Sequence, residues 1–181
     1  YYFSGTGNSL HVAKELQKRL PESQLIPMVS LFDKDEVITK GETVGFVFPL
    51  YFTTIPAPVR RFLMKLNLTS AQYTFLVVTR IGTLSVTDIE VQRILKKKRK
   101  RLDCQSLLNM ANNSPTGLKP GKGDKNWVTQ ITEKKVSQIE SEVQSQLDMI
   151  YKIILAQEQY PKKTFPNPFL SLLERIMYLL T

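Results

Sequence analysis

The chain is 181 residues long, with 42% hydrophobic and 23% charged residues, which suits a single globular domain with a sizeable core. One cysteine and one histidine exclude an internal disulfide and a C-x-x-C zinc site, and they leave little for histidine-based catalysis. No apolar run approaches the length of a membrane span and no secretory signal is evident, so we expect a cytoplasmic protein without a transmembrane segment.

The first elements in chain order are a short strand and a helix. The aromatic residues 1–3 are followed at once by a glycine-containing turn, which predicts the end of a buried strand. Apolar residues then recur at helical spacing over 8–20, with Asn8 or Ser9 as the N-cap, until Pro21 ends the run. The turn over residues 4–9 therefore joins a strand to a helix.

The rest of the chain alternates between strand and helix patterns. Further strands are predicted at 23–28, 43–49, 73–79 and 105–111, and helices at 57–66, 87–102, 126–159 and 167–181. Five strands separated by helices predict an α/β fold with a doubly wound parallel sheet and helices on both faces. The helix over 126–159 is longer than the sheet it must cover, so we expect its second half to project.

Three segments follow the ends of predicted strands, at 4–9, 49–52 and 79–82. In parallel α/β folds, ligands bind in the crevice outside the carboxyl ends of the strands. The three segments are therefore expected to line one crevice.

The turn at residues 4–9 has the chemistry of a phosphate site. Gly5 and Gly7 relax the backbone, and the amides at a helix N-terminus attract anions. Polar side chains add hydrogen-bonding groups at Ser4, Thr6, Asn8 and Ser9. A Walker nucleotide loop is not expected, because the lysine of G-x-x-x-x-G-K-[ST] is absent. On these features alone, a plain strand-to-helix turn stays an alternative.

A resemblance makes the site more specific. Residues 4–9, SGTGNS, resemble the FMN phosphate loop of flavodoxins, [ST]-x-T-G-[NT]-[ST]. Residues 44–63, VGFVFPLYFTTIPAPVRRFL, are similar to the third strand and flavin loop of flavodoxin domains that precede a ferredoxin domain. The resemblance implies an FMN-binding electron-transfer domain over 1–160, with strand order 2-1-3-4-5 and a C-terminal helical extension over 161–181.

The resemblance also assigns a role to each segment. The phosphate of FMN would be held by Ser4, Gly5, Thr6, Gly7, Asn8 and Ser9. The wall against the flavin ring would be formed by Pro49, Leu50, Tyr51 and Phe52. The polar edge of the ring would be met by Thr79, Arg80, Ile81 and Gly82. This last segment departs from the more glycine-rich turn of the ferredoxin-fused relatives.

Two of these assignments have structural alternatives. Tyr51 and Phe52 either stack on the flavin or pack in the core, and we favour stacking because loops begin at this strand end. Arg80 either faces the flavin, where its charge would stabilise the anionic reduced ring and raise the potential, or points to solvent. These two outcomes for Arg80 are equally expected.

The basic run KKKRKR at 96–101 accounts for most of the formal net charge of +9. We interpret it first as a solvated helix end, because cations complement the helix dipole there. The alternative function is a flavin-free, flavodoxin-fold binding module that uses this basic surface for an acidic partner or nucleic acid. Nucleic acid is the less expected partner, since no aromatic residues are interleaved with the run. With FMN, the expected partner is an acidic redox protein or a ferredoxin-type domain.

The remaining predictions concern single residues and the last third of the chain. His11 is expected on a helix surface and Cys104 as a small buried residue. Asn112, Asn113 and Ser114 leave a strand end and either border the flavin or form a simple surface connection, which we favour. The apolar segment 167–181 is expected to pack against the long helix, with a homodimer through the C-terminal helices as the alternative.

Overall fold

The computed structural model describes residues 1–111 and 132–159, and within these it is an α/β protein with parallel strands. The elements in chain order are α1 (Asn8–Arg19), η1 (Met28–Leu31), β1 (Val37–Ile38), β2 (Thr43–Pro49), α2 (Ala57–Lys65), β3 (Leu66–Asn67), β4 (Tyr73–Arg80), α3 (Thr87–Lys97), β5 (Cys104–Asn109) and α4 (Glu133–Leu155). Among the described residues, no helix is both long and apolar enough to cross a membrane.

The main sheet has three parallel strands in the order β2-β4-β5. Thr43 of β2 lies opposite Tyr73 of β4, and Phe75 of β4 lies opposite Cys104 of β5. The central strand β4 is buried from Tyr73 to Thr79, because helices cover both of its faces. The sequence predicted β2 and β4 to within one residue, since both are runs of apolar residues of the kind found in buried parallel strands.

The expected strands at 1–3 and 23–28 are reduced to single bridges. Tyr2 forms parallel bridges with Pro27 on one side and Val47 on the other. The Tyr2 amide donates to the Ile26 carbonyl at 3.0 Å, and the Phe3 amide donates to the Val47 carbonyl at 2.9 Å. Pro27 has no amide hydrogen to extend the ladder, and the chain turns into η1 directly after it.

A second, two-stranded parallel sheet pairs β1 with β3. Val37 of β1 is buried beside Leu66 of β3, and the hydroxyl of Thr39 donates to the Asn67 carbonyl at 3.0 Å. The sequence did not predict this sheet, because two-residue strands carry no detectable hydrophobic period.

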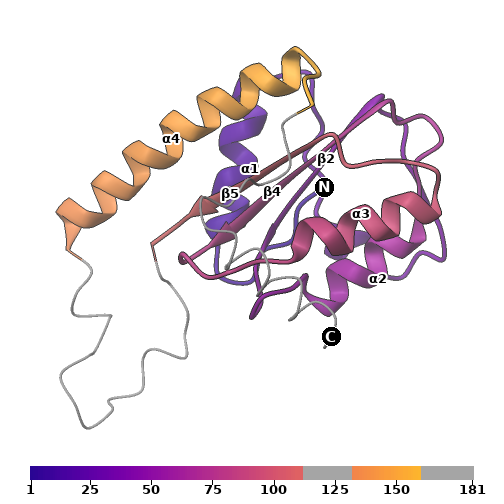
Figure 1. Cartoon of the computed structure of the whole chain (residues 1–181), viewed down its shortest axis with the longest axis horizontal. Helices are drawn as coiled ribbons and strands as arrows, with labels where there is room; N and C mark the ends of the chain where they lie inside the picture. The colour runs from indigo at the N-terminus through magenta and orange to yellow at the C-terminus, as the bar shows by residue number, and fades with distance from the viewer. Residues whose placement is uncertain (112–131, 160–181) are drawn as a thin grey trace, which may run out of the picture.

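Helices cover both faces of the main sheet (Figure 1), and each face has its own core. The α2 and α3 side is filled by large residues that include Phe46, Phe48, Phe62, Leu63, Leu76 and Leu95. The α1 and α4 side is filled by Val12, Leu16, Val47, Val77, Leu147 and Ile150, among others. Alternate residues of β2 and β4 therefore supply opposite cores, as the two-residue period of a strand requires.

A close cross-strand contact lies on the α1 and α4 side of the sheet. Gly45 of β2 is paired in register with Phe75 of β4, whose side chain is 8% exposed. A Cβ atom at position 45 would lie 2.0 Å from Cζ of the Phe75 ring. The absence of a side chain at Gly45 thus provides the space that this ring occupies.

Helix α4 is shorter than expected and packs the other way round. Thr132 caps it by accepting a hydrogen bond from the Lys135 amide at 3.2 Å, so the helix begins at Glu133 and not at 126. The expectation that its second half projects is wrong. The first turns are exposed, whereas the second half is buried against the sheet through Val143, Leu147, Ile150, Ile153 and Ile154.

Helix α3 ends earlier than expected, at Lys97, inside the basic run. The Lys100 amide donates to the Leu95 carbonyl at 3.0 Å, and Arg99 adopts the left-handed conformation with φ 58°. This is the Schellman pattern of a helix C-terminus. The Lys98 ammonium donates to the Met64 carbonyl at the end of α2 at 2.8 Å, so part of the run is structural.

Candidate functional site

Helix α1 begins with a glycine cap. Gly7 is the N-cap with φ 104°, so the expectation that Asn8 or Ser9 caps the helix is wrong. The Gly7 amide donates to the hydroxyl of Ser4 at 3.1 Å, which closes the turn before the helix. Glycine has no side chain to accept hydrogen bonds from the amides of the first turn. A glycine cap therefore suits an anion as the acceptor for these amides.

Asn8 and Ser9 connect this loop to neighbouring strands. The hydroxyls of Ser9 and Thr79 lie 2.7 Å apart in a buried pair, which joins α1 to the end of β4. The side-chain amide of Asn8 donates to the Ala111 carbonyl at 2.9 Å, beyond the end of β5. Ser9 therefore points into the protein, while Gly5 and Thr6 are exposed in the loop.

The second segment leaves β2 and lies against the first. The Leu50 amide donates to the Thr79 carbonyl at 2.8 Å, so this loop starts beside the end of β4. The Tyr51 ring lies edge-on to Phe3, with ring centroids 6.5 Å apart. A Cβ atom on Gly5 would lie 2.6 Å from the Tyr51 hydroxyl, so the absence of that atom lets the phenol lie against the loop. Pro49 and Leu50 are half-buried.

Tyr51 and Phe52 are not core residues. Tyr51 and Thr54 exchange backbone hydrogen bonds at 3.2 and 3.1 Å, and this tight turn places Phe52 at φ 58° with its side chain 94% exposed. Tyr51 is also exposed. The alternative of core packing for these two aromatic residues is therefore wrong.

The third segment turns away from the end of β4. The Arg80 guanidinium donates to the Asn109 side-chain oxygen at 3.0 Å and to the Thr83 carbonyl at 2.6 Å. Gly82 has φ 90°, a conformation that favours glycine, and Ile81 is exposed. Two hydrogen bonds thus hold the Arg80 side chain near the ends of β4 and β5.

The structure brings the three predicted segments together at the carboxyl ends of β2 and β4. Ser9 and Leu50 both contact Thr79, and Gly5 faces Tyr51. The three segments contain no Asp or Glu, and Arg80 supplies their positive charge. The arrangement combines a helix N-terminus without a side-chain cap, exposed aromatic rings and a cation, which suits an anionic ligand with an aromatic portion.

Sequence analysis missed the residue that fixes the second segment. Glu90 of α3 is buried and accepts hydrogen bonds from the Thr54 hydroxyl and from the Ile55 amide at 3.0 Å. Its other oxygen accepts from Arg60 at 2.7 Å. The sequence did contain a signal for Glu90, because it directly precedes Val91 on the buried side of α3. A carboxylate at such a position requires hydrogen-bond or ion-pair partners.

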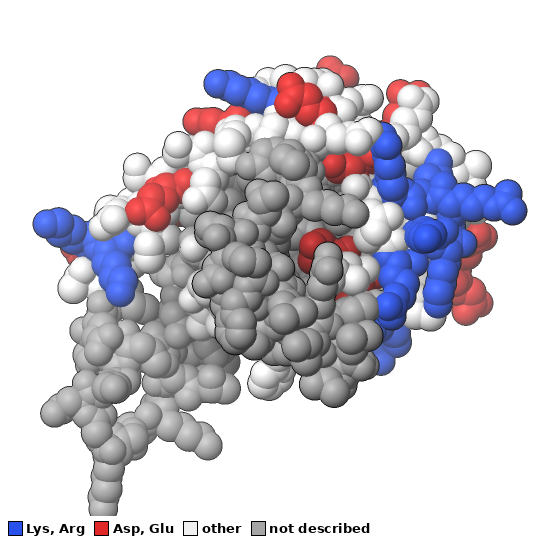
Figure 2. All heavy atoms as spheres, viewed as in Figure 1, with Lys and Arg blue, Asp and Glu red and all other residues white. Residues whose placement is uncertain are grey.

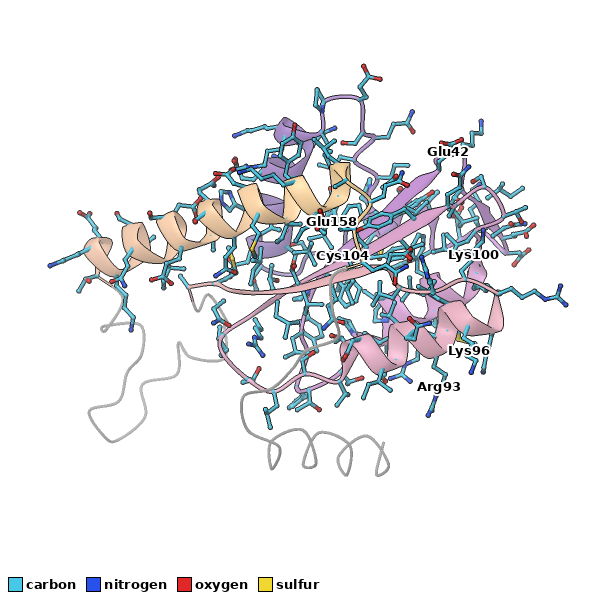
Figure 3. The ribbon with its side chains drawn as sticks, turned by 45° about the horizontal axis from the view of Figure 1, so that its top comes forward. Glu42, Arg93, Lys96, Lys100, Cys104 and Glu158 are labelled. Carbon is cyan, nitrogen blue, oxygen red and sulfur yellow. The ribbon has the colours of Figure 1, made fainter. Side chains whose placement is uncertain are left out.

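The contacts of Cys104 and His11 indicate structural roles for both residues. Cys104 is buried on β5 near the end of α4, where Glu158 also lies (Figure 3), and burial raises the pKa of its thiol to about 11. A thiol with that pKa is not a nucleophile at neutral pH. His11 lies 2.9 Å from a Glu140 oxygen and links α1 to α4.

Some predictions fall outside the described residues. They are the roles of Asn112, Asn113 and Ser114, the segment 167–181, and the homodimer through the C-terminal helices. Ala111, the residue before the first of these, lies beside the N-terminus of α1.

Comparisons with known proteins do not assign the chain to a family. No protein-family model matches the chain, and no curated protein is significantly similar to it.

Proposed function

We propose that this chain is a flavodoxin-like domain that binds FMN and transfers electrons to or from a redox partner. The observation that carries the proposal is the meeting of the three segments 4–9, 49–52 and 79–82 at one edge of a parallel sheet. Ligands of α/β folds bind at this edge. The bridges of Tyr2 to Pro27 and Val47 support the proposed strand order, in which 26–28, 1–3, β2, β4 and β5 lie side by side.

The residues present fit FMN. The glycine-capped first turn of α1, together with Ser4 and Thr6, would hold the phosphate. Tyr51 and Phe52 would cover the ring and exclude water from it, because both side chains are exposed and Tyr51 lies against Gly5 of the phosphate loop. FMN itself supplies the redox chemistry when bound. Asn8 and Ser9 would position the loop through Ala111 and Thr79.

The direct test is reconstitution of the purified chain with FMN, followed by fluorescence quenching of the free flavin. Stoichiometric binding is expected. A chain that stays colourless and leaves FMN fluorescence unchanged would overturn the proposal. That result would favour the flavin-free binding module that uses the basic surface.

Thr6→Leu is expected to weaken FMN binding by about tenfold or more, because it replaces a hydroxyl at the phosphate with a bulky apolar group. The free energy of unfolding should change by less than about 0.5 kcal/mol, since Thr6 is exposed. Ser137→Leu on the exposed first turns of α4 is the matched control and should leave FMN affinity unchanged. Equal affinity of both variants would remove the phosphate site from this loop.

Arg80→Ala is expected to lower the reduction potential for the last electron added to bound FMN. A cation held near the ring favours the anionic reduced form, so its loss should shift the potential by on the order of 50 mV, or about 1 kcal/mol. Arg61→Ala removes the same charge from an exposed position on α2 and serves as the control. Spectroelectrochemical titration at matched FMN occupancy measures both. Coinciding potentials would show that Arg80 does not tune the flavin.

A further inference from the structure

A groove of about 420 Å³ lies between α2 and α3, and the described residues that line it belong to none of the three segments of the proposed FMN site. Helix α2 contributes Arg60 and Met64, and α3 contributes Glu90, Arg93, Ile94 and Lys97. Lys98, directly after α3, also lines it. The groove is thus formed by two neighbouring helices on one face of the sheet (Figure 1).

The groove offers an apolar surface. Met64 is 61% exposed although it follows the buried Leu63, and Ile94 beside it is only partly buried. Burying such a methionine against a partner removes apolar surface from water and so stabilises the complex. An occupant therefore gains from an apolar side chain at this position.

The charge around this surface is positive. Basic side chains gather at the end of the molecule where α3 stops (Figure 2), and Arg93 points from α3 away from the sheet (Figure 3). Lys98 is held against the Met64 carbonyl at 2.8 Å, so one ammonium is fixed at the groove. The carboxylate of Glu90 is paired with Arg60 at 2.7 Å and buried, so it repels an acidic occupant only weakly.

The geometry points to a docking site for an acidic segment of a partner protein, in which an apolar residue lies between carboxylates. The apolar residue would cover Met64 and Ile94, and the carboxylates would meet Lys97 and Lys98. Nucleic acid fits less well, because its affinity comes from phosphate contacts and base stacking, and no aromatic residue is found among the described residues that line the groove. The described lining of this groove contains none of the residues proposed to hold FMN, although Glu90 connects it through Thr54 to the turn that carries Tyr51 and Phe52.

The test uses fluorescence anisotropy of a labelled peptide of glutamates interrupted by leucines, with the full chain as the binding partner. Lys97→Glu and Met64→Ser are each expected to weaken binding about fivefold, by loss of charge attraction and of apolar contact. Their controls are Lys135→Glu and Met149→Ser, both exposed on α4, which should change the affinity less than twofold. Circular dichroism establishes that all four variants are folded.

Four results would overturn the proposal. The first is no binding of the peptide, and the second is equal effects of the groove variants and their controls. The third is equal binding of a peptide with serines in place of the leucines, which would indicate diffuse charge attraction only. The fourth is tighter binding of a single-stranded oligonucleotide of the same charge with no effect of Met64→Ser, which would make the basic run a nucleic-acid surface.

Discussion

Gly45→Ala is expected to lower the free energy of unfolding by about 3 kcal/mol, a large effect for the addition of one methyl group. The new Cβ atom would lie 2.0 Å from Cζ and 2.4 Å from two further atoms of the Phe75 ring. The ring is buried in the core between the sheet and the α1 and α4 layer, so it can move only by displacing its neighbours. Urea unfolding of the wild-type chain and the variant measures the difference.

A double-mutant cycle separates this clash from other effects of alanine. Phe75→Ala alone should cost about 3 to 5 kcal/mol, because it leaves a cavity in the core. In that background the space above position 45 is empty, so Gly45→Ala should be neutral or slightly stabilising, since alanine suits a strand better than glycine. Additive effects of the two substitutions would show that the ring does not limit position 45.

Glu90→Ala is expected to lower the free energy of unfolding by about 2 to 3 kcal/mol. The substitution leaves the buried Ile55 amide without its acceptor and removes the partner of the Thr54 hydroxyl. The cost stays below that of a fully buried ion pair, because the Arg60 side chain is 46% exposed and solvent can take over its charge. Glu142→Ala on the exposed face of α4 is the control and should change the free energy by less than about 0.5 kcal/mol.

The same variant has a local signature. The Ile55 amide should exchange with solvent faster in Glu90→Ala, while the amides of β4 should keep their relative protection. Because Thr54 closes the turn that carries Tyr51 and Phe52, FMN affinity should also fall. An unchanged exchange rate at Ile55 would show that Glu90 does not hold this loop.

The sequence predicted the elements whose pattern is decided locally. Strands β2 and β4 were found because their apolar runs are continuous, and α1, α2 and α3 because their apolar residues recur at helical spacing. The glycine cap of α1 was missed, since it depends on the left-handed backbone of Gly7, which no side-chain pattern reveals. The packed half of α4 was misjudged because the length of the pattern does not show which part meets the sheet.

The site was predictable as a set of loops but not as a set of contacts. The rule that ligands bind at the carboxyl ends of parallel strands identified the three segments that the structure brings together. Side-chain partners were not predictable, because they come from distant parts of the chain. Ser9 meets Thr79 across 70 residues, and Asn8 meets Ala111 across 103. Glu90 holds the second loop from a helix that sequence analysis treated only as cover for the sheet.

The parallel pairing around Tyr2 also determines how the chain can fold. Tyr2 is flanked by Pro27 and Val47, which both lie far along the chain from it. Strands β2 and β4 are also separated in the sequence, by α2 and β3. No pair in the main sheet is a hairpin, so loop-closure entropy must be offset before any of these strands gains a partner, and such topologies fold slowly. During synthesis, the aromatic residues 1–3 leave the ribosome before β2, so they stay unpaired until β2 has been made. Until then their exposed rings are a ready target for chaperones and for aggregation.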